Sequence, residues 1–163
     1  MKIVIPVAAI IILSIVFTFA NSATPGNIVF PEDQLQSSLE NELQDGRWEL
    51  VMFWATYCHI CKKDFKKLGK FIEDNPDISM TLVGVVIDGL EEQDETHALV
   101  KKHHLDYTHL VTDYDRANIV YQEESGKKLV GTPSYLLYNP QNELVAFNTN
   151  AIDIDALEIY VYE

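Results

Sequence analysis

Cysteine is scarce in this chain of 163 residues, which contains only Cys58 and Cys61. A zinc site would have to recruit histidines such as His97 and His103, which lie far beyond the short ligand spacing of a zinc finger. A c-type haem attachment is excluded, because it needs a histidine directly after the second cysteine and position 62 is lysine. A purely structural disulfide would gain little from closing so short a loop, so the pair calls for a chemical explanation.

Basic residues are also few. The chain has 12 lysine and arginine residues against 25 aspartate and glutamate residues, which gives a net charge of −13. This surplus of acids would repel a phosphate backbone, so we expect no nucleic-acid partner. The sequence has no glycine-rich phosphate loop, no hydrolase order of Ser, His and Asp and no internal repeat, and we expect no bound cofactor.

Only one apolar run is long, and it lies at the N-terminus. It extends from Ile3 to Phe19 after the single charge of Lys2, and small-residue cleavage sites follow at Thr18-Phe19-Ala20 and Ala20-Asn21-Ser22. We expect residues 1–22 to be a signal peptide, with an uncleaved membrane anchor as the alternative. Export would place the protein in the periplasm or at the extracytoplasmic face of the membrane. Residues 23–31 are then a linker and residues 32–163 a single folded domain.

The apolar pattern predicts the order of elements in this domain. Helices are expected over residues 32–44, 59–74, 91–103, 115–121 and 152–160. Strands are expected over residues 48–54, 78–87, 110–111, 135–138 and 144–147. Strands that alternate with helices and end in a hairpin predict an α/β fold with a mixed central sheet flanked by helices.

The two cysteines lie where a predicted strand gives way to a predicted helix. The strand stops at Thr56-Tyr57, and the amphipathic pattern begins directly after Cys58. Unpaired backbone N–H groups and the helix dipole favour a thiolate at this position. Two residues bent into a first helical turn bring Cys61 close enough to form a disulfide. The predicted chemistry is thiol–disulfide exchange.

Two motifs together carry a family resemblance. They are Phe53-Trp54-Ala55-Thr56-Tyr57-Cys58-x-x-Cys61-Lys62-Lys63-Asp64-Phe65 and Gly131-Thr132-Pro133-Ser134-Tyr135-Leu136-Leu137, the second followed by the turn Asn139-Pro140-Gln141-Asn142. Over residues 45 to 150 the chain resembles the thioredoxin superfamily, and within it the TlpA/ResA-type extracytoplasmic thiol-disulfide oxidoreductases. The resemblance implies a thioredoxin-like fold.

The resemblance also implies roles for the residues of the second motif and of the pair. Cys58 would be the nucleophile and Cys61 the thiol that resolves the mixed disulfide. Pro133 would be a cis-proline facing the pair, and the backbone of Thr132 would bind an extended substrate segment. Trp54 and Tyr57 would form an apolar collar, although Trp54 is equally explained as a core aromatic.

Charged groups near the pair would tune the exchange. Thioredoxins keep a buried aspartate six residues before the first cysteine, but this chain has Met52 there. ResA-type proteins have an acid six residues after that cysteine, and here the position is Asp64, shorter than the usual glutamate. Asp64 would accept the proton of Cys61. His59, as a cation, would stabilise the Cys58 thiolate and make the pair more oxidising, unless it is only a polar residue facing solvent.

The predicted helix from residue 59 carries most of the basic residues of the chain. One interpretation is a solvated face. The other is that Lys62 and Lys63 add positive potential near the sulfurs.

The resemblance implies a reductase that acts on protein cysteines in the cell envelope, for example in cytochrome c biogenesis, with electrons from a membrane donor. An oxidase or an isomerase is the alternative direction, because His59 would shift the pair toward oxidation. The rival from another class is a chaperone for copper or another soft metal on the same fold. It would bind Cu(I) through Cys58, Cys61 and a histidine.

Overall fold

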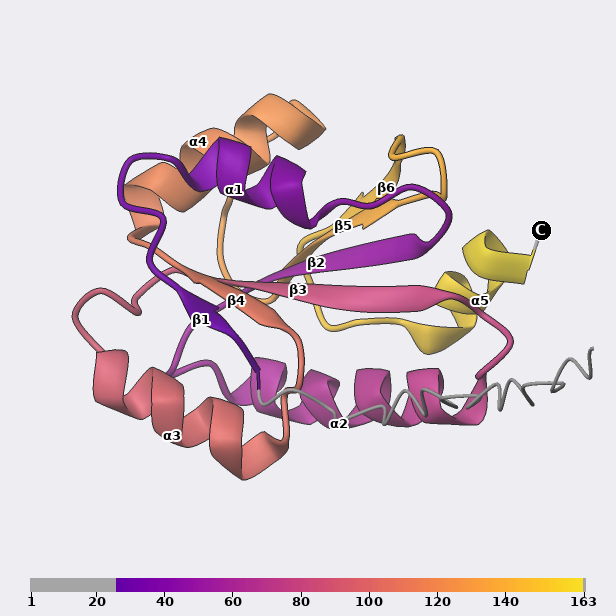
Figure 1. The fold of residues 1–163 in the computed structure, drawn as a ribbon, viewed down its shortest axis with the longest axis horizontal. Coiled ribbons are helices and arrows are strands. Elements are labelled where there is room, and N and C mark those ends of the chain that lie inside the picture. The colour runs from indigo at the N-terminus through magenta and orange to yellow at the C-terminus, as the bar shows by residue number, and fades with distance from the viewer. Residues whose placement is uncertain (1–25, 163) are drawn as a thin grey trace, which may run out of the picture.

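A six-stranded mixed sheet forms the centre of the computed structural model, which describes residues 26–162 (Figure 1). The strand order is β1-β4-β3-β2-β5-β6. The strands are β1 (Ile28–Val29), β2 (Trp48–Trp54), β3 (Met80–Val86), β4 (Thr108–Val111), β5 (Ser134–Tyr138) and β6 (Leu144–Asn148). The first four are parallel to one another, whereas β5 is antiparallel to β2 and β6 is antiparallel to β5. The predicted mixed sheet with a closing hairpin is confirmed.

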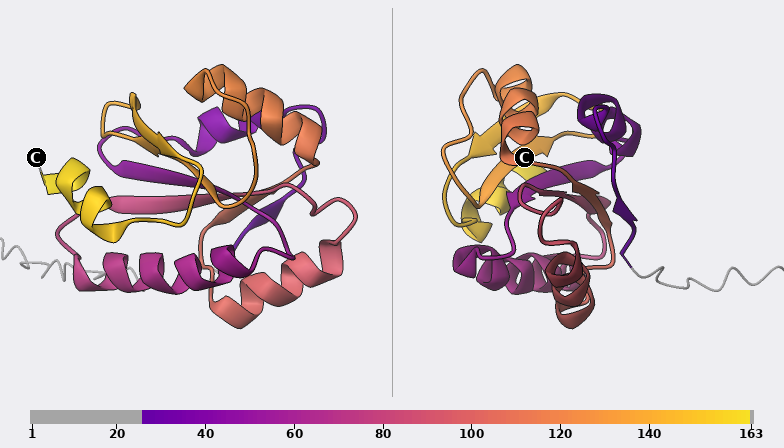
Figure 2. Two further views of the ribbon diagram at one scale, coloured as in Figure 1. Left: turned by 180° about the vertical axis from the view of Figure 1, so that it is seen from behind. Right: turned by 90° about the vertical axis from the view of Figure 1, so that its left-hand side faces the viewer.

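Helices cover both faces of this sheet. They are α1 (Leu35–Glu42), α2 (His59–Asp74), α3 (Gln93–His103), α4 (Tyr114–Ser125) and α5 (Ile154–Tyr162). Helices α1 and α4 lie on one face and α2 and α3 on the other, as Figures 1 and 2 show from three directions. Helix α5 lies beside the hairpin of β5 and β6, on the α2 side.

Most element bounds agree with the apolar pattern, and β2 and α2 agree to the residue. Helix α4 is longer than predicted because both of its ends are capped. The Asp113 side chain accepts from the Arg116 N–H at 2.9 Å, and Gly126 ends the helix in the left-handed conformation. Strand β1 lies inside residues 23–31, the expected linker, and two residues are too few to show any periodicity.

Strand β2 is buried on both sides, as its unbroken apolar run predicted. On one side, the Trp54 ring packs edge-on against Phe65 of α2 with ring centroids 5.2 Å apart. On the other side, Phe53 packs in the same way against Tyr121 of α4, also at 5.2 Å. The carboxyl end of β2 is therefore held firmly between two layers of helix, and the two cysteines follow directly from it.

Among residues 26–162, no helix is both long enough and apolar enough to span a bilayer. The expected signal peptide or anchor, residues 1–22, lies outside the described residues.

Candidate redox site

Cys58 and Cys61 form a disulfide at the start of α2, with their Cα atoms 5.3 Å apart. Cys58 is the N-cap of the helix, and its sulfur accepts from the backbone N–H of Cys61 at 3.1 Å. Cys58 keeps 6% of its surface exposed, whereas Cys61 keeps none. The sulfur that a partner can reach is therefore the one that lies against the amino-terminal N–H groups of α2, where a negative charge is favoured.

An acid that follows the neighbouring strand β3 fixes the loop between β2 and Cys58 by hydrogen bonds. Asp88 follows β3, and its two carboxylate oxygens accept from the Thr56 backbone N–H at 3.0 and 3.1 Å. The Thr56 hydroxyl donates to the same carboxylate at 2.7 Å. This positioning role of Asp88 was not predicted from the sequence. The sequence did contain a signal for it. Asp88 is an acid just after the buried strand β3, which is parallel to β2, the strand that leads to the cysteines.

Trp54 lies in the core beneath the site, which corrects its predicted place in the collar. It has no exposed surface, and its ring lies 5.7 Å from that of His109. Gly84 makes room for both rings, because an added Cβ would lie 2.9 Å from Trp54 Nε1 and 2.3 Å from His109 Nδ1. The reason is that β2 is covered on both faces, so its last aromatic residue does not reach solvent.

Exposed apolar residues occur beside the cysteines in the chain and in the loop before Pro133. Tyr57 is 67% exposed and Ile60 is 47% exposed, while His59 between the cysteines also faces solvent. Val130, three residues before Pro133, is 76% exposed and was not singled out from the sequence. Its position could have indicated a surface role, because it is an apolar residue in the loop directly before the second motif.

Pro133 lies at the same edge of the sheet as the disulfide. The Thr132–Pro133 peptide bond is cis, as the resemblance implied. Ser134 pairs with Phe53 in antiparallel register, so Pro133 is placed beside the last residue of β2. The loop to Cys58 starts from the same point, and the second motif therefore meets the first.

Asp64 is fully buried one helical turn after Cys61. Its Oδ2 accepts from the Tyr135 hydroxyl and from the Ile152 backbone N–H, both at 2.9 Å. The Lys67 ammonium lies 3.0 Å from Oδ1. These three groups hold the carboxylate in one orientation, and they tie α2 to β5 and to the segment that enters α5.

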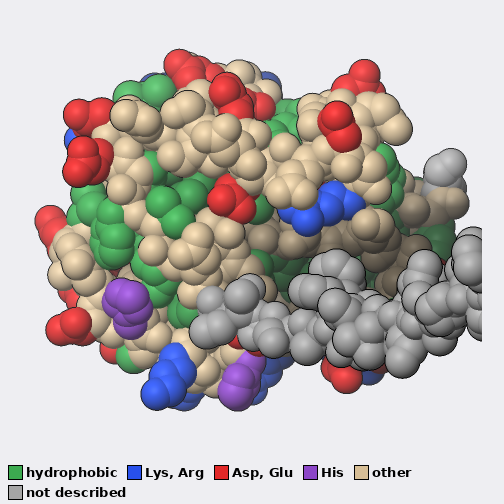
Figure 3. Space-filling model, in the orientation of Figure 1, with side chains coloured by type: hydrophobic (Ala, Val, Ile, Leu, Met, Phe, Trp, Pro, Cys, Tyr) green, Lys and Arg blue, Asp and Glu red, His purple; other side chains and the backbone are tan. Residues whose placement is uncertain are grey.

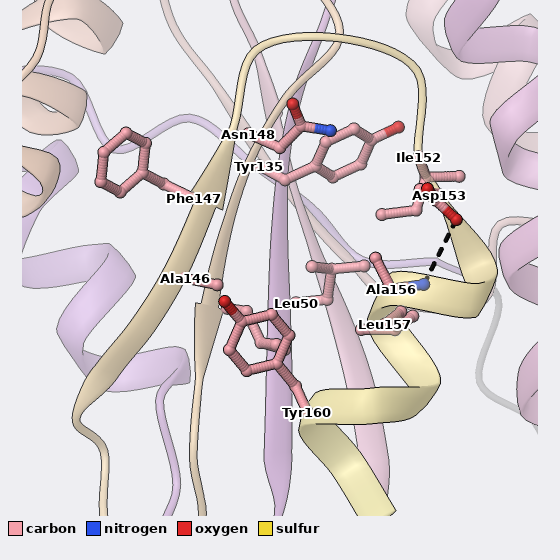
Figure 4. Close-up of a pocket in the computed structure, with 11 residues that line it drawn as sticks. Leu50, Tyr135, Ala146, Phe147, Asn148, Ile152, Asp153, Ala156, Leu157 and Tyr160 are labelled. Carbon is pink, nitrogen blue, oxygen red and sulfur yellow. Dashed lines mark hydrogen bonds between the residues drawn. The ribbon is translucent and has the colours of Figure 1, made fainter.

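Tyr135 separates Asp64 from an apolar groove. Burial, and then the negative charge of Asp64, raise the pKa of the Tyr135 hydroxyl above its ordinary value, so it stays a hydrogen-bond donor. The groove lies between the hairpin and α5 (Figure 4). Its apolar lining comes mainly from Leu50, Leu137, Ala146, Ile152, Leu157 and Tyr160.

His109 is the buried histidine on this side of the sheet. Its Nε2 lies 3.3 Å from the Leu105 carbonyl oxygen, and burial lowers its pKa to about 4. The imidazole is therefore neutral at neutral pH. In the described part of the chain, no three His, Cys, Asp or Glu side chains are grouped so that they could hold a metal ion.

Comparison with known proteins identifies relatives of both sequence and fold. The AhpC/TSA family matches residues 27–147. The thiol-disulfide oxidoreductase ResA of Oceanobacillus iheyensis is 22% identical over 171 residues, which cover 93% of this chain and 82% of that protein.

Three solved structures confirm the thioredoxin-like fold. The thioredoxin domain of a Bacteroides vulgatus thiol-disulfide oxidoreductase superposes with a TM-score of 0.57 at 24% identity, covering 72% of this chain and 81% of that one. A secreted Mycobacterium tuberculosis disulfide oxidoreductase gives 0.54 at 21% identity, covering 72% and 82%. StoA from Bacillus subtilis gives 0.54 at 20% identity, covering 72% and 84%.

Proposed function

The chain belongs to the AhpC/TSA family, and from this premise we propose that it is a thiol-disulfide oxidoreductase acting on protein cysteines. One observation carries the proposal. The disulfide joins the N-cap of α2 to a residue one turn further along, so only Cys58 is available to a partner. A pair built in this way can exchange its disulfide with another protein through a single reactive sulfur.

In the reducing direction, the Cys58 thiolate attacks one sulfur of the target disulfide. An S–S bond forms between the two proteins, and the other target sulfur leaves as a thiolate. Cys61 then loses its proton and attacks the sulfur of Cys58. The second target thiolate leaves, and the bond between Cys58 and Cys61 closes. The target has gained two electrons and the protein has lost two.

We assign the proton of Cys61 to Asp64. The carboxylate lies one turn further along the same helix and is shielded from solvent. Its Oδ1 is contacted only by Lys67, whose partly exposed ammonium leaves this oxygen the freer of the two. Met52 offers no acid from the strand, which supports Asp64 as the proton acceptor in this proposal.

Substrate segments would bind across the exposed apolar groups and the second motif. Tyr57 and Ile60, next to the cysteines in the chain, and Val130, in the loop that leads to Pro133, are exposed apolar residues that would contact such a segment. An extended segment pairs with the Thr132 backbone, beside Pro133, and brings its cysteine to Cys58.

The proposal is tested by reduction of insulin disulfides with dithiothreitol as the electron source. We expect turnover by the unmodified protein and none by Cys58→Ser. Cys61→Ser should instead accumulate a covalent mixed disulfide through Cys58, because the resolving step is blocked. Turnover that persists in the double variant Cys58→Ser/Cys61→Ser would overturn the proposal.

We further propose that the reaction runs in the cell envelope and in the reducing direction, with a membrane protein as electron donor. Support comes from the apolar run and cleavage sites of residues 1–22 and from the ResA relative. A potential of the pair near −270 mV against glutathione supports a reductase, and one near −120 mV contradicts it. Fusion of residues 1–31 to a reporter that is active only after export tests the location.

A further inference from the structure

The first three turns of α2 carry positive charge without exposed negative charge. Between His59 and Lys70 the chain has five lysines. The only carboxylate in this stretch is that of Asp64, which is fully buried beneath the helix. The exposed side of α2 is therefore basic over its first three turns, and the exposed acids Glu73 and Asp74 follow only in its last turn.

The end of α3 adds to the same surface. His103, in the last turn of α3, lies with its ring 6.0 Å from that of Phe65, which places this turn against the first half of α2. Burial, and then the charges of Lys102, Lys66 and Lys62, lower the pKa of His103. Lysines of both helices therefore contribute positive potential at this imidazole.

Most of these lysines are not neutralised by a neighbour. Lys67 pairs with Asp64, and Lys70 pairs with Asp74. No ion pair within residues 26–162 includes the five lysines that define what we call the α2–α3 basic surface, namely Lys62, Lys63, Lys66, Lys101 and Lys102. On the face shown in Figure 3, basic and histidine side chains lie along the lower edge, where α3 lies, with some acids beside them, and acids are also numerous along the upper edge.

The sign of the charge on these two helices is opposite to that of the chain as a whole. Helices α2 and α3 together carry seven lysines against five acids, namely Asp64, Glu73, Asp74, Asp94 and Glu95, which gives them a net charge of +2 in a protein whose net charge is −13. The basic surface begins at the residue after Cys61, so its lysines lie along the same helix as the reactive pair, where their charge can act on an approaching partner.

We propose that the α2–α3 basic surface docks redox partners whose reactive cysteine lies in an acidic stretch of polypeptide. The inference rests on the proposed exchange activity and names the class of partner. Exchange requires an encounter, and complementary charge beside the reactive atoms speeds encounter and suppresses partners of the wrong sign. An acidic partner is repelled by the protein as a whole but attracted at the place where the reaction occurs.

The test uses three synthetic peptides of equal length, each with one cysteine linked by a disulfide to thionitrobenzoate. The cysteine is flanked by four glutamates, four serines or four lysines. Reduced protein and peptide disulfide give oxidised protein, peptide thiol and the coloured thionitrobenzoate, with two electrons passing to the peptide disulfide. The second-order rate constant is measured at low salt and again in about 0.5 M salt, where exposed charges are screened.

We expect the acidic peptide to react about tenfold faster than the serine peptide, and the lysine peptide to react more slowly than both. High salt should bring the three rates together. Lys62→Glu/Lys66→Glu should reverse the order of the acidic and lysine peptides, with each rate taken relative to that of the serine peptide in the same variant, so that any change in the reactivity of Cys58 itself cancels. The matched control is Lys127→Glu/Lys128→Glu, which makes the same change in net charge in the loop after α4, outside the α2–α3 basic surface, and should keep the original order.

Three outcomes would overturn the inference. One is the order expected from net charge, with the lysine peptide fastest. Another is equal loss of preference in both double variants, which would make the effect one of total charge. The third is binding of the reduced protein to anionic vesicles with no preference among peptides, which would assign the surface to lipid.

Failure of the serine peptide to react at all would instead overturn the proposed exchange activity. Lys62→Gln/Lys66→Gln, expected to remove the preference without reversing it, serves if the charge reversal does not fold.

Discussion

Two buried carboxylates, Asp64 and Glu49, lie on opposite faces of the sheet and are held in different ways. Neither has exposed surface, and each has a cation beside it. Asp64 is contacted at both oxygens by groups from three elements or segments, two of them 71 and 88 residues away in sequence. Glu49 receives Arg47 Nε at 2.6 Å and the Gln44 N–H at 3.0 Å, both at Oε1.

Asp64 therefore makes long-range hydrogen bonds between distant elements, whereas Glu49 makes only local ones. Glu49 Oε2 is buried and has no hydrogen-bond partner among the described residues, and burial raises the pKa of Glu49. Its contacts close a short loop before β2. Asp64 connects the redox helix to the strand that follows Pro133 and to α5. Asp64 Oδ1 also has no hydrogen-bond partner among the described residues, but the Lys67 ammonium lies 3.0 Å from it, whereas Glu49 Oε2 has no cation beside it.

The largest effect is expected from Asp64→Asn. Resolution of the mixed disulfide should slow about 100-fold, because the proton of Cys61 loses its acceptor. The free energy of unfolding should also fall by about 3 kcal/mol, because two hydrogen bonds to a charged group become bonds to a neutral amide. Rapid-quench analysis and urea denaturation measure the two quantities. A fall in stability with an unchanged resolving rate would leave Asp64 with a structural role alone.

His109 extends the comparison to a buried group that carries no charge. Its pKa of about 4 in the folded protein lies below the ordinary 6.5, so the unfolded chain binds the proton more tightly. Its contribution to stability is complete above pH 6.5 and is lost as the pH falls toward 4. Between pH 7 and pH 5 the loss should be about 2 kcal/mol.

Denaturation at the two pH values measures this change, with His109→Phe as the control. The variant should lose the His109 part of the pH dependence whatever its absolute stability. An identical pH slope in both proteins would show that His109 is not the titrating group.

Tyr135→Phe and Tyr138→Phe form a matched pair across the sheet. Tyr135 donates to Asp64, whereas Tyr138 donates to Glu124 at 2.7 Å on the α4 side. Each loss of a hydroxyl should cost about 1 to 2 kcal/mol in the free energy of unfolding. Only Tyr135→Phe should alter the pH profile of mixed-disulfide resolution, because only Tyr135 contacts the proposed proton acceptor. Equal profiles in the two variants would contradict that assignment.

The smallest effect is expected from Glu49→Gln. The amide keeps an acceptor for Gln44 and Arg47 and removes a charge that is costly to bury, so unfolding free energy at pH 7 should change by less than about 1 kcal/mol. The raised pKa of Glu49 opposes stability as the pH rises above 4.5, so the variant should gain relative to the unmodified protein over that range. Exchange rates should not change.

Local patterns in the sequence predicted the elements that carry the pair, and they did so for physical reasons. The run from Trp48 to Trp54 and the amphipathic stretch from His59 to Asp74 are long and end in clear signals, so their bounds agree with the structure. Strand β1 has two residues, and its pairing with β4 depends on atoms about 80 residues away. No local pattern contains that information.

In the candidate site, too, some features could be predicted from local sequence and others depend on the fold. The positions of Cys58, Cys61 and Asp64 follow from spacing along one helix, which a sequence displays directly. The partners of Asp64 come from β5 and from the segment before α5, and only the folded chain brings them together. Trp54 was placed in the collar because its sequence position is next to the site, while the covering of β2 on both faces decides its burial.

Alkylation of the reduced protein with iodoacetamide at pH 7, with each cysteine followed by mass spectrometry, tests the central claim most directly. The account predicts that Cys58 reacts faster than the thiol of an unstructured peptide and that Cys61 reacts far more slowly. If neither sulfur reacts faster than the peptide thiol, Cys58 is not an ionised and accessible nucleophile, and the proposed exchange chemistry is contradicted.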